Sequence, residues 1–470
     1  MTGRPDFDLV VLGGGSAGFA ASIRGADLGA RVALIEGGTL GGTCVNVGCV
    51  PSKTLIRAAE SQHRRTHHGF SGVPVTNGEP DWLVVREQKD ALANELRAAK
   101  YWDVLRSYTG IDLIEQGGRL EPGGAVRLAH GTKVSATKVV VTTGASPWTA
   151  PIPGLAETHY LDSASAMALE RLPASMIVIG ASAVGLELAQ MFARLGVEVT
   201  VLEALPTVVP MEDPAVGMAL GQYLRAEGLR IETSVRVEQV ESTANRHRVH
   251  YRRDNAVGTV VADQLLVATG RRANTRGLGL VEAGVAVGNK GEVVVNEYLG
   301  TANPDVYAAG DVIGDPMFVY VAAYAGSTAA DNALTRDRIR YDLTTLPRVT
   351  FTDPAVAAVG LTEAEASAKG VEPLVSHLGL AHVPRALVAR DTRGFIQLVA
   401  DAASRRIVGA QIVAADAGEV IMEAALAIRF GLTIDNLTTT FHPYLTLAEG
   451  VKLAAQTFDK DVAKLSCCAA

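Results

Sequence analysis

The sequence predicts an α/β protein with two Rossmann-like dinucleotide-binding domains and an α+β carboxyl-terminal dimerisation domain. Two glycine-rich turns, at residues 13–18 and 180–185, each lie between an apolar strand and a helix of small residues. Strands that end in Thr-Gly close the two copies, at residues 139–144 and 265–270. From about residue 341 short strands and helical runs follow without a nucleotide motif, and we expect them to form a subunit interface.

Length and composition indicate a folded protein of several domains. A chain of 470 residues is too long for one hydrophobic core. Hydrophobic residues make up 48% and charged residues 20%, which is typical of a folded domain and not of a disordered chain. The formal charge of -7 gives no reason to expect nucleic acid or an anionic membrane as a partner. We find neither a signal peptide nor a membrane-spanning run, so we expect a cytoplasmic protein.

The first glycine-rich turn has the full context of a dinucleotide site. An apolar strand at residues 7–12 leads into Gly13, Gly15 and Gly18, and Glu36 ends the next strand. Gly13 permits the tight turn, Gly15 lets a pyrophosphate approach the backbone, and Gly18 allows close packing of helix on strand. The pyrophosphate would face the amino terminus of the helix, where free N–H groups favour anions. Glu36 is placed to bind ribose hydroxyls.

The second turn repeats this pattern with one change. It contains Gly180, Ser182 and Gly185, and Glu203 ends the strand that follows. Ser182 replaces the middle glycine but is small enough for close backbone approach. Two such folds imply two bound nucleotides; the alternative is one real site and one decayed copy. Glu203 would bind the 2′-OH of NAD and repel the 2′-phosphate of NADP. No Arg or Lys lies between residues 201 and 221 to neutralise that phosphate. The sequence therefore favours NADH, or the use of both donors.

The four cysteines form two pairs at opposite ends of the chain. Cys44 and Cys49 precede helix-forming sequence, and a helix start lowers the pKa of a thiol and favours the thiolate. Their spacing allows a disulfide or a dithiol, and Lys53 could supply positive charge beside them. Cys467 and Cys468 are adjacent near the carboxyl end and predict a clamp for a soft metal ion. The alternatives are a structural disulfide for the first pair and incidental cysteines for the second.

These motifs together resemble the flavin disulfide reductases of the glutathione reductase and lipoamide dehydrogenase types. The resemblance rests on the segment 41–53, on the two dinucleotide folds and on Ala309-Gly310-Asp311. It implies FAD in the first fold, NADPH or NADH as hydride donor in the second, and a homodimer whose active sites are shared between subunits. The implied domains are an FAD-binding domain (1–150 and 275–340), an NAD(P)H-binding domain (151–274) and a dimerisation domain that ends in the Cys-Cys tail (341–470).

The matching motif positions imply a role for each site residue. Cys49 would lie against the flavin ring, and Cys44 would be the outer, exchange-active sulfur. Lys53 would pair with Glu187 beside flavin N5. Asp311 ends a strand, where its carboxylate could accept hydrogen bonds from the ribityl chain of FAD. The other cofactor contacts that the resemblance implies are Ala17, Thr43, Gly144, Gly270 and Val319.

The carboxyl-terminal segment indicates one branch of this family. Disulfide-reducing members carry a His-Pro and a Glu five residues after the His, and the His and Glu act as an acid–base pair for the leaving thiol. This chain retains His442 but has Leu447 at the Glu position. Tyr444 could bring a phenol to the dithiol instead, and Tyr101 matches a second active-site tyrosine of the branch. With the terminal cysteine pair, these features resemble the members that reduce Hg(II), a soft ion with an accessible two-electron reduction.

The reaction implied is reduction of Hg(II) to Hg(0) by NAD(P)H through FAD, which would detoxify mercury. Small thiols would carry Hg(II) to Cys467 and Cys468 of one subunit, and thiolate exchange would pass it to Cys44 and Cys49 of the other, so all four are expected metal ligands. One alternative is a dihydrolipoamide dehydrogenase-like or other thiol–disulfide oxidoreductase, against which Leu447 argues. A second is a non-catalytic metal-sequestering protein, against which the nucleotide motifs argue.

Overall fold

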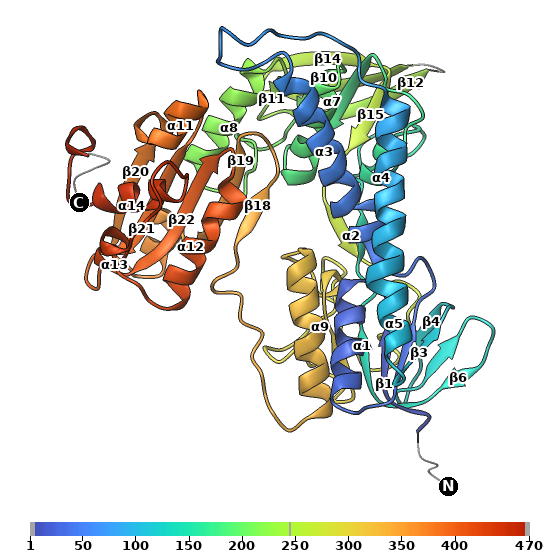
Figure 1. Ribbon diagram of the computed structural model, residues 1–470. Coiled ribbons are helices and arrows are strands. Elements are labelled where there is room, and N and C mark those ends of the chain that lie inside the picture. Colours follow the sequence, from blue (N-terminus) through green and yellow to red (C-terminus); the bar gives the residue numbers. More distant parts are fainter. Residues whose placement is uncertain (1–4, 244–245, 466–470) are drawn as a thin grey trace. The chain divides into compact units, whose positions relative to one another are not determined.

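A computed structural model describes residues 5–243 and 246–465 (Figure 1). The mixture of parallel sheets and helices confirms the predicted α/β class. The chain divides into two compact units: Met1–Thr54, Val84–Thr149 and Gly270–Asp342 form the first, and Leu55–Leu83, Ala150–Thr269 and Leu343–Ala470 form the second. The predicted domain boundaries stay a prediction, because this division groups the second dinucleotide fold with the carboxyl-terminal region.

The first unit is built on a parallel sheet with the strand order β17-β7-β1-β2-β3. Its strands are β1 (Phe7–Leu12), β2 (Val32–Ile35), β3 (Ile111–Ile114), β7 (Ala136–Val141) and β17 (Val306–Ala308). Helices α1 (Ser16–Asp27) and α9 (Val319–Leu334) lie side by side on one face (Figure 1). Apolar side chains that alternate along the strands are buried on both faces, as expected for a parallel sheet covered on both sides.

Smaller elements complete the first unit. A long helical stretch consists of α4 (Trp82–Arg97), the π-helix η1 (Ala98–Trp102) and α5 (Asp103–Ser107). The dithiol segment contains α2 (Gly42–Val47) and the start of α3 (Cys49–Arg64), which continues into the second unit. The remaining elements are β4 (Gly118–Leu120), β5 (Val126–Leu128), β6 (Lys133–Val134), β8 (Ala145–Pro147), β16 (Arg271–Ala273) and η2 (Asp311–Ile313).

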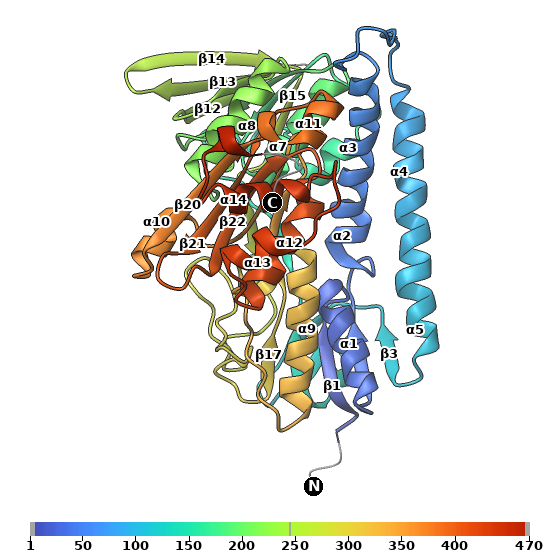
Figure 2. The ribbon, with the colours of Figure 1, turned by 60° about the vertical axis from the view of Figure 1, so that its left-hand side comes forward.

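The second unit contains the other dinucleotide fold, a parallel sheet with the order β11-β10-β9-β15. An antiparallel sheet of β12, β13 and β14, which the sequence did not predict, adds to it (Figure 2). The elements are α6 (Ser163–Met167), β9 (Ser175–Ile179), α7 (Ala183–Arg194), β10 (Glu198–Leu202), α8 (Pro214–Ala226), β11 (Arg230–Glu232), β12 (Arg236–Thr243), β13 (Arg246–Arg253), β14 (Ala256–Ala262) and β15 (Gln264–Val267).

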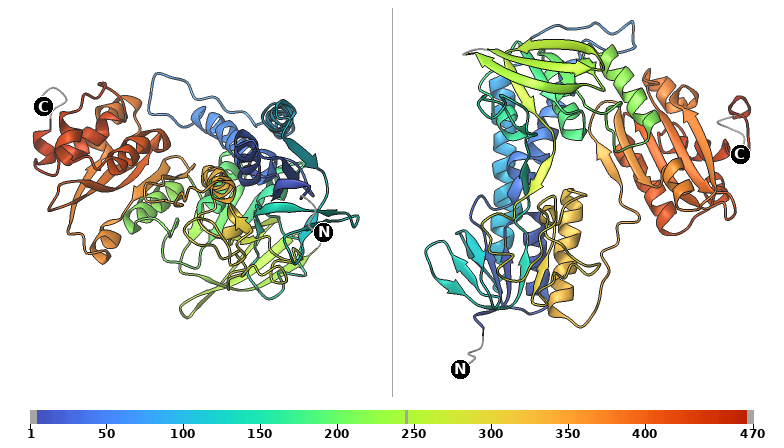
Figure 3. Two further views of the ribbon diagram at one scale, coloured as in Figure 1. Left: turned by 90° about the horizontal axis from the view of Figure 1, so that it is seen from below. Right: turned by 180° about the vertical axis from the view of Figure 1, so that it is seen from behind.

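The carboxyl-terminal region is an antiparallel sheet, β18-β19-β22-β21-β20, with helices α12 and α14 packed on it (Figure 3). Its elements are β18 (Arg348–Thr350), β19 (Ala355–Gly360), α10 (Glu363–Ala368), β20 (Pro373–Gly379), η3 (Leu380–His382), α11 (Pro384–Ala389), β21 (Phe395–Asp401), β22 (Ile407–Ala414), α12 (Ala417–Arg429), α13 (Ile434–Thr439), α14 (Glu449–Gln456) and η4 (Val462–Lys464). This agrees with the α+β unit expected there. Among the described residues, no helix has the length and apolar character needed to span a bilayer.

Candidate active site

The first glycine-rich turn is too tightly packed for side chains at two of its positions. Gly13 has a φ of 110°, and a Cβ on it would overlap the carbonyl of Thr142 at the end of β7. A Cβ on Gly18 would overlap the carbonyl of Gly13. Gly15 is the N-cap of α1 and no side chain caps the helix. The backbone N–H groups at this helix start therefore suit the phosphates of a dinucleotide.

Glu36 stands at the end of β2 beside this turn, where the sequence predicted a ribose ligand. Its Oε2 accepts a hydrogen bond from the N–H of Gly14 at 2.5 Å, and its Oε1 accepts one from the N–H of Gly38 at 2.5 Å. The carboxylate thus also orders the turn itself. That second role was not predicted, because it depends on how the turn folds back over the end of the strand.

The dithiol segment packs directly against the glycine-rich turn. Gly41 and Gly42 have φ values of 95° and 61°, which favour glycine. The N–H of Gly41 donates to the carbonyl of Gly14 at 2.9 Å. A Cβ on Gly42 would lie 2.7 Å from the Cα of Gly15. The structure therefore brings the predicted dithiol to the same edge of the sheet as the predicted phosphate site.

Cys44 lies within α2, Cys49 is the first residue of α3, and both are thiols. The hydrogen bond with Cys49 and burial raise the pKa of the Cys44 thiol, and the charge of Lys53 opposes this shift only in part. A low pKa was expected for the cysteines at a helix start, and for Cys44 this is wrong. The hydrogen bond to the neighbouring sulfur and the burial of the thiol outweigh the effect of the helix start in this short helix.

Asn46, between the two cysteines, fixes the shape of this segment. Its Nδ2 donates to the carbonyls of Leu40 and Gly42, at 3.0 and 2.8 Å. Its Oδ1 accepts a hydrogen bond from Nη1 of Arg97, at the end of α4, at 2.8 Å. Neither residue was predicted from the sequence. Their signal is weak, because an Asn between two cysteines looks like an ordinary loop residue until its partners are known.

Tyr101 lies in the π-helix η1, next to the start of the dithiol segment, and its role as an active-site tyrosine stays a prediction. Its ring packs on that of Phe19, with centroids 4.7 Å apart, and lies 3.3 Å from where a Cβ on Gly41 would be. Burial raises the pKa of the Tyr101 phenol, a hydrogen bond to Ser16 lowers it, and the charges of the two cysteines raise it further. A π-turn is a frequent feature of functional sites.

Asp311, the predicted ribityl contact, lies in η2 and is partly buried. Burial raises the pKa of its carboxyl group, and the guanidinium of Arg271 lowers it. Arg271 also approaches the hydroxyl of Thr43 at 3.5 Å and donates to the carbonyl of Ala145. Gly270 was predicted as a cofactor contact from the sequence, but its neighbour Arg271 was not. Gly144 follows β7 with a φ of 70°, and Val319 begins α9.

The second glycine-rich turn has the geometry of the first. A Cβ on Gly180 would overlap the carbonyl of Ala268, and one on Gly185 would overlap the carbonyl of Gly180. Ser182 is the N-cap of α7, but its side chain makes no capping hydrogen bond. Glu203 is buried; its Oε2 accepts from the N–H of Ala181 at 2.6 Å and its Oε1 from the N–H of Leu205 at 2.9 Å.

The remaining predicted site residues are Glu187 and Tyr444 in the second unit, Lys53 in the first unit, and the two terminal cysteines. Glu187 is buried on α7, and its Oε1 accepts from the N–H of Phe351 at 2.8 Å. Lys53 belongs to the first unit, so its pairing with Glu187 stays a prediction. Tyr444 lies before α14 and is more than half exposed. Cys467 and Cys468 lie outside the described residues.

His442, at the family's acid–base position, has a carboxylate partner that the sequence did not suggest. Its Nε2 lies 2.7 Å from Oε1 of Glu423 on α12, and its Nδ1 lies 3.0 Å from the carbonyl of Thr440. The substitution at position 447 therefore does not leave the imidazole without a carboxylate partner.

Within residues 5–243 and 246–465, no group of three or more His, Cys, Asp or Glu side chains could hold a metal ion.

Comparison with known proteins agrees with this geometry. The family described as pyridine nucleotide-disulphide oxidoreductase matches residues 7–326, and its dimerisation domain matches residues 346–455. The chain belongs to this family. It is 45% identical to the mercuric reductase of Staphylococcus aureus over 99% of this chain and 84% of the relative, and 44% identical to that of Streptomyces lividans over 98% of each.

Solved structures extend the likeness to the whole fold. The HOCl-induced flavoprotein disulfide reductase RclA from Escherichia coli has a TM-score of 0.84 and 30% identity, and the match covers 94% of this chain and 98% of that one. LpdA from Mycobacterium tuberculosis has a TM-score of 0.86 and 29% identity, with 96% and 99% covered. The resemblance noted in the sequence is confirmed, and with it FAD and NAD(P)H as cofactors.

Proposed function

We propose that this protein reduces Hg(II) to Hg(0) with electrons from NAD(P)H, as its mercuric reductase relatives are named for doing. One observation carries the proposal: the pair Cys44 and Cys49 lies against a dinucleotide turn, in a chain 44–45% identical to those relatives over nearly its whole length. Two adjacent thiolates suit a soft ion. Bound FAD would supply the chemistry by accepting a hydride from NAD(P)H and delivering its two electrons at the dithiol.

The residues of the first unit would hold and orient the reacting groups. Gly13 and Gly18 permit the tight turn and the close packing of its helix, and Gly15 would let the pyrophosphate of FAD approach the backbone. Asp311 would accept hydrogen bonds from the ribityl hydroxyls. Cys49 would face the flavin and Cys44 would exchange with incoming thiolates. Glu187 and Lys53 would form an ion pair beside the flavin. Tyr101 and Tyr444 would shield the dithiol and line the path of the metal. Gly180, Ser182, Gly185 and Glu203 would hold the nicotinamide dinucleotide.

The terminal cysteines would act as a relay. Hg(II) would arrive bound to the sulfurs of two small thiols. The thiolates of Cys467 and Cys468 of one subunit would displace these two ligands, which leave as thiolates. Cys44 and Cys49 of the other subunit then displace the tail cysteines. Each exchange forms one Hg–S bond and breaks another, so no free ion is needed.

A homodimer would provide the shared site. The match to the family's dimerisation domain supports it, and so does a set of apolar side chains on α12 and in the loop that precedes α14. These side chains are 48% exposed or more: Met422, Leu426, Phe430, Phe441 and Tyr444. Exposed large apolar side chains gathered in one region of the sequence are consistent with a surface that another subunit covers. We place the enzyme in the cytoplasm, where NAD(P)H is available.

The decisive assay is NAD(P)H oxidation by the purified flavoprotein with Hg(II) and excess small thiol. We expect Hg-dependent turnover in the parent, its loss in Cys44→Ser, and a reduced rate in the double variant Cys467→Ala/Cys468→Ala at high thiol concentration. Absence of Hg-dependent turnover in a parent that contains FAD would contradict the proposed reaction. An unimpaired double variant at every thiol concentration would contradict only the relay.

A second candidate, thiol–disulfide reduction, is favoured by the pair of His442 and Glu423 at 2.7 Å. A carboxylate that orients an imidazole would let it protonate a leaving thiolate. Turnover with lipoamide or glutathione disulfide that falls in Glu423→Gln would support this activity. No turnover with either disulfide would exclude it for these substrates.

A further inference from the structure

One face of helix α7, the helix that follows the second glycine-rich turn, carries three buried polar side chains. They are Glu187, Gln190 and Arg194, and each is at most about 5% exposed. Their spacing places them on one side of the helix, roughly one turn apart. Burial of polar groups on this scale destabilises a protein unless each group has a hydrogen-bonding partner. The hydrogen-bonding partners of these three side chains therefore indicate the role of this helix face.

All three side chains bind one short segment, residues 351–353, between β18 and β19. Oε1 of Glu187 accepts from the N–H of Phe351 at 2.8 Å. Gln190 binds both backbone groups of Asp353: Oε1 accepts from its N–H and Nε2 donates to its carbonyl, each at 2.8 Å. Nη1 of Arg194 lies 2.9 Å from Oδ2 of Asp353. Two residues of extended chain span about 6.6 Å, close to the 5.4 Å rise of one helical turn, so segment and helix match in length.

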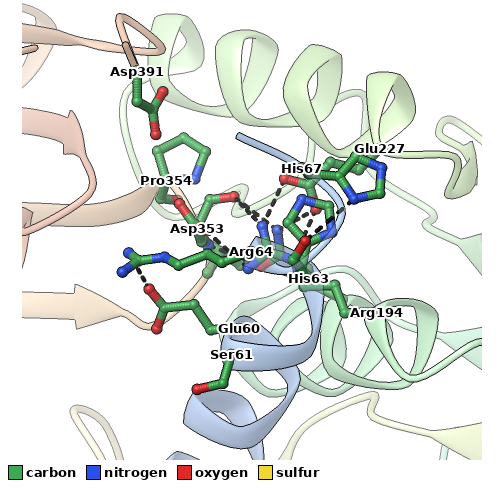
Figure 4. Close-up of polar contacts among 12 residues, drawn as sticks. Glu60, Ser61, His63, Arg64, His67, Arg194, Glu227, Asp353, Pro354 and Asp391 are labelled. Carbon is green, nitrogen blue, oxygen red and sulfur yellow. Dashed lines mark hydrogen bonds and ion pairs between the residues drawn. The ribbon is translucent and has the colours of Figure 1, made fainter. Parts of the chain in front are cut away.

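The far end of this arrangement is held by a buried ion network (Figure 4). Glu227 accepts from Nη2 of Arg194 and from Nη1 of Arg393, each at 2.8 Å. Nη2 of Arg393 donates to Oδ1 of Asp353 at 3.0 Å. Burial and the neighbouring Arg194 lower the pKa of His63 to about 4, so this imidazole is neutral at pH 7 and adds no charge. Removing one member of such a network leaves a buried charge without compensation.

We propose that Gln190 and Arg194 are positioning residues for Glu187. Both side chains bind Asp353 and so fix the backbone of the segment 351–353. The N–H of Phe351 is then held in place and donates to Oε1 of Glu187. This hydrogen bond sets the direction in which Oε2 points. The inference rests on the proposed function, in which Glu187 pairs with Lys53 beside the flavin. The carboxylate must then be held still, because a charge that moves by an ångström next to a reacting centre changes both potential and rate.

The test uses the FAD-loaded enzyme and the variants Gln190→Leu and Arg194→Lys. The first removes the amide that binds Asp353, and the second keeps the charge but loses the forked geometry. A loosened Glu187 would neutralise Lys53 less well, so reduced flavin would be stabilised and the flavin midpoint potential would become more positive. We also expect flavin reduction by NADH to slow about fivefold to tenfold in stopped-flow measurements. Arg194→Lys should show the smaller change of the two.

The matched control is Arg225→Lys. Arg225 on α8 belongs to the same nucleotide fold, and its Nη2 donates to the carbonyl of Ile231 at 3.1 Å, so its guanidinium also binds a backbone segment, but on β11 and not at residues 351–353. A parental potential in this control and a shifted one in Gln190→Leu would support the positioning role. Equal shifts in both, or none in either, would overturn it. Neither readout needs Hg(II), so failure of mercury reduction alone would not be mistaken for failure of this inference.

Discussion

The two dinucleotide folds of this chain have nearly the same backbone but different surroundings. Gly13 and Gly180 have φ values of 110° and 107°. The N-caps of the two helices, Gly15 and Ser182, have φ and ψ of −75° and −172° and of −80° and −178°. In each fold the acid at the end of the second strand binds backbone N–H groups of the turn. The turn is thus specified by sterics and one carboxylate, whatever the side chain at its middle position.

The folds differ in what is attached to this shared scaffold. The first carries the dithiol segment, which packs its Gly42 against Gly15. The second has Glu187 on its helix, two residues after Gly185, where the first has Ala20. Thr142 braces the first turn with its hydroxyl, and the corresponding residue of the second fold is Ala268, which has none. The first copy therefore carries the dithiol, and the second carries a buried carboxylate on its helix.

The largest expected effect comes from filling the tightest glycine of each fold. Gly18→Val and Gly185→Val each force a side chain into a backbone carbonyl, that of Gly13 or of Gly180. We expect Gly18→Val to abolish FAD binding and to destabilise the first unit by about 3 kcal/mol or more. Gly185→Val should keep FAD but lose reduction by NADH. Flavin absorbance, and bleaching by NADH compared with dithionite, measure the two losses.

The comparison of FAD binding in Gly18→Val and Gly185→Val tests whether the two folds bind their nucleotides independently. If Gly185→Val also loses FAD, the two folds depend on each other for stability and cannot be treated as separate sites. Gly29→Ala provides a control, because a Cβ there meets no atom within 4 Å, although its φ of 80° adds a small strain. We expect that variant to lose about 1 kcal/mol of stability and no cofactor.

A second prediction concerns the acids that end the second strand in each fold. Glu203→Gln removes a negative charge where the 2′-phosphate of NADPH would lie, and we expect the kcat/KM ratio of NADPH to NADH to rise about tenfold. Glu36→Gln removes the equivalent charge in the first fold and should leave that ratio unchanged. Steady-state kinetics with both donors measure this. A ratio that moves equally in both variants would show that the two folds do not bind different nucleotides.

These folds are also where the sequence was most informative. Strands such as Phe7–Leu12 and Ser175–Ile179 could be predicted to the residue, because a continuous apolar run followed by a glycine-rich turn leaves little choice. The dithiol and Tyr101 could be predicted to lie together only through the family resemblance. The π-turn that presents Tyr101 leaves no clear trace in the sequence, because its residues are ordinary helix formers.

Interactions that depend on distant partners could not be predicted. The raised pKa of Cys44 follows from its hydrogen bond and burial, and local sequence at a helix start pointed in the opposite direction. His442 was compared with one fixed position, 447, whereas its carboxylate comes from Glu423 on another helix. The hydrogen bonds from the buried polar side chains of α7 to residues 351–353 join parts of the chain that are far apart in sequence. The placing of Cys467 and Cys468 stays a prediction.

A smaller effect should separate the folds at Thr142. Its buried hydroxyl donates to the carbonyls of Leu12 and Gly13, each at 2.9 Å. Thr142→Val keeps the shape and loses these bonds, so we expect a loss of about 1 kcal/mol in the free energy of unfolding and weaker FAD retention. Urea denaturation of the apo and FAD-bound protein measures both. Ala268→Ser tests the reverse change; a gain there would indicate that the brace is transferable, and a loss would tie it to the first fold.

The smallest expected effect tests why Gly15 is a glycine. Its backbone angles are open to any residue, and a Cβ there would meet only the Cα of Gly42, at 3.7 Å. Folding does not need a glycine at this position, so Gly15→Ser should stabilise the apo protein by about 0.5 kcal/mol, because it restricts the unfolded chain. Ser182→Gly should lower stability by a similar amount. If Gly15→Ser weakens FAD binding while it stabilises the apo protein, the glycine serves the pyrophosphate. If it destabilises the apo protein, the backbone requires glycine after all, and the difference between the two turns is structural.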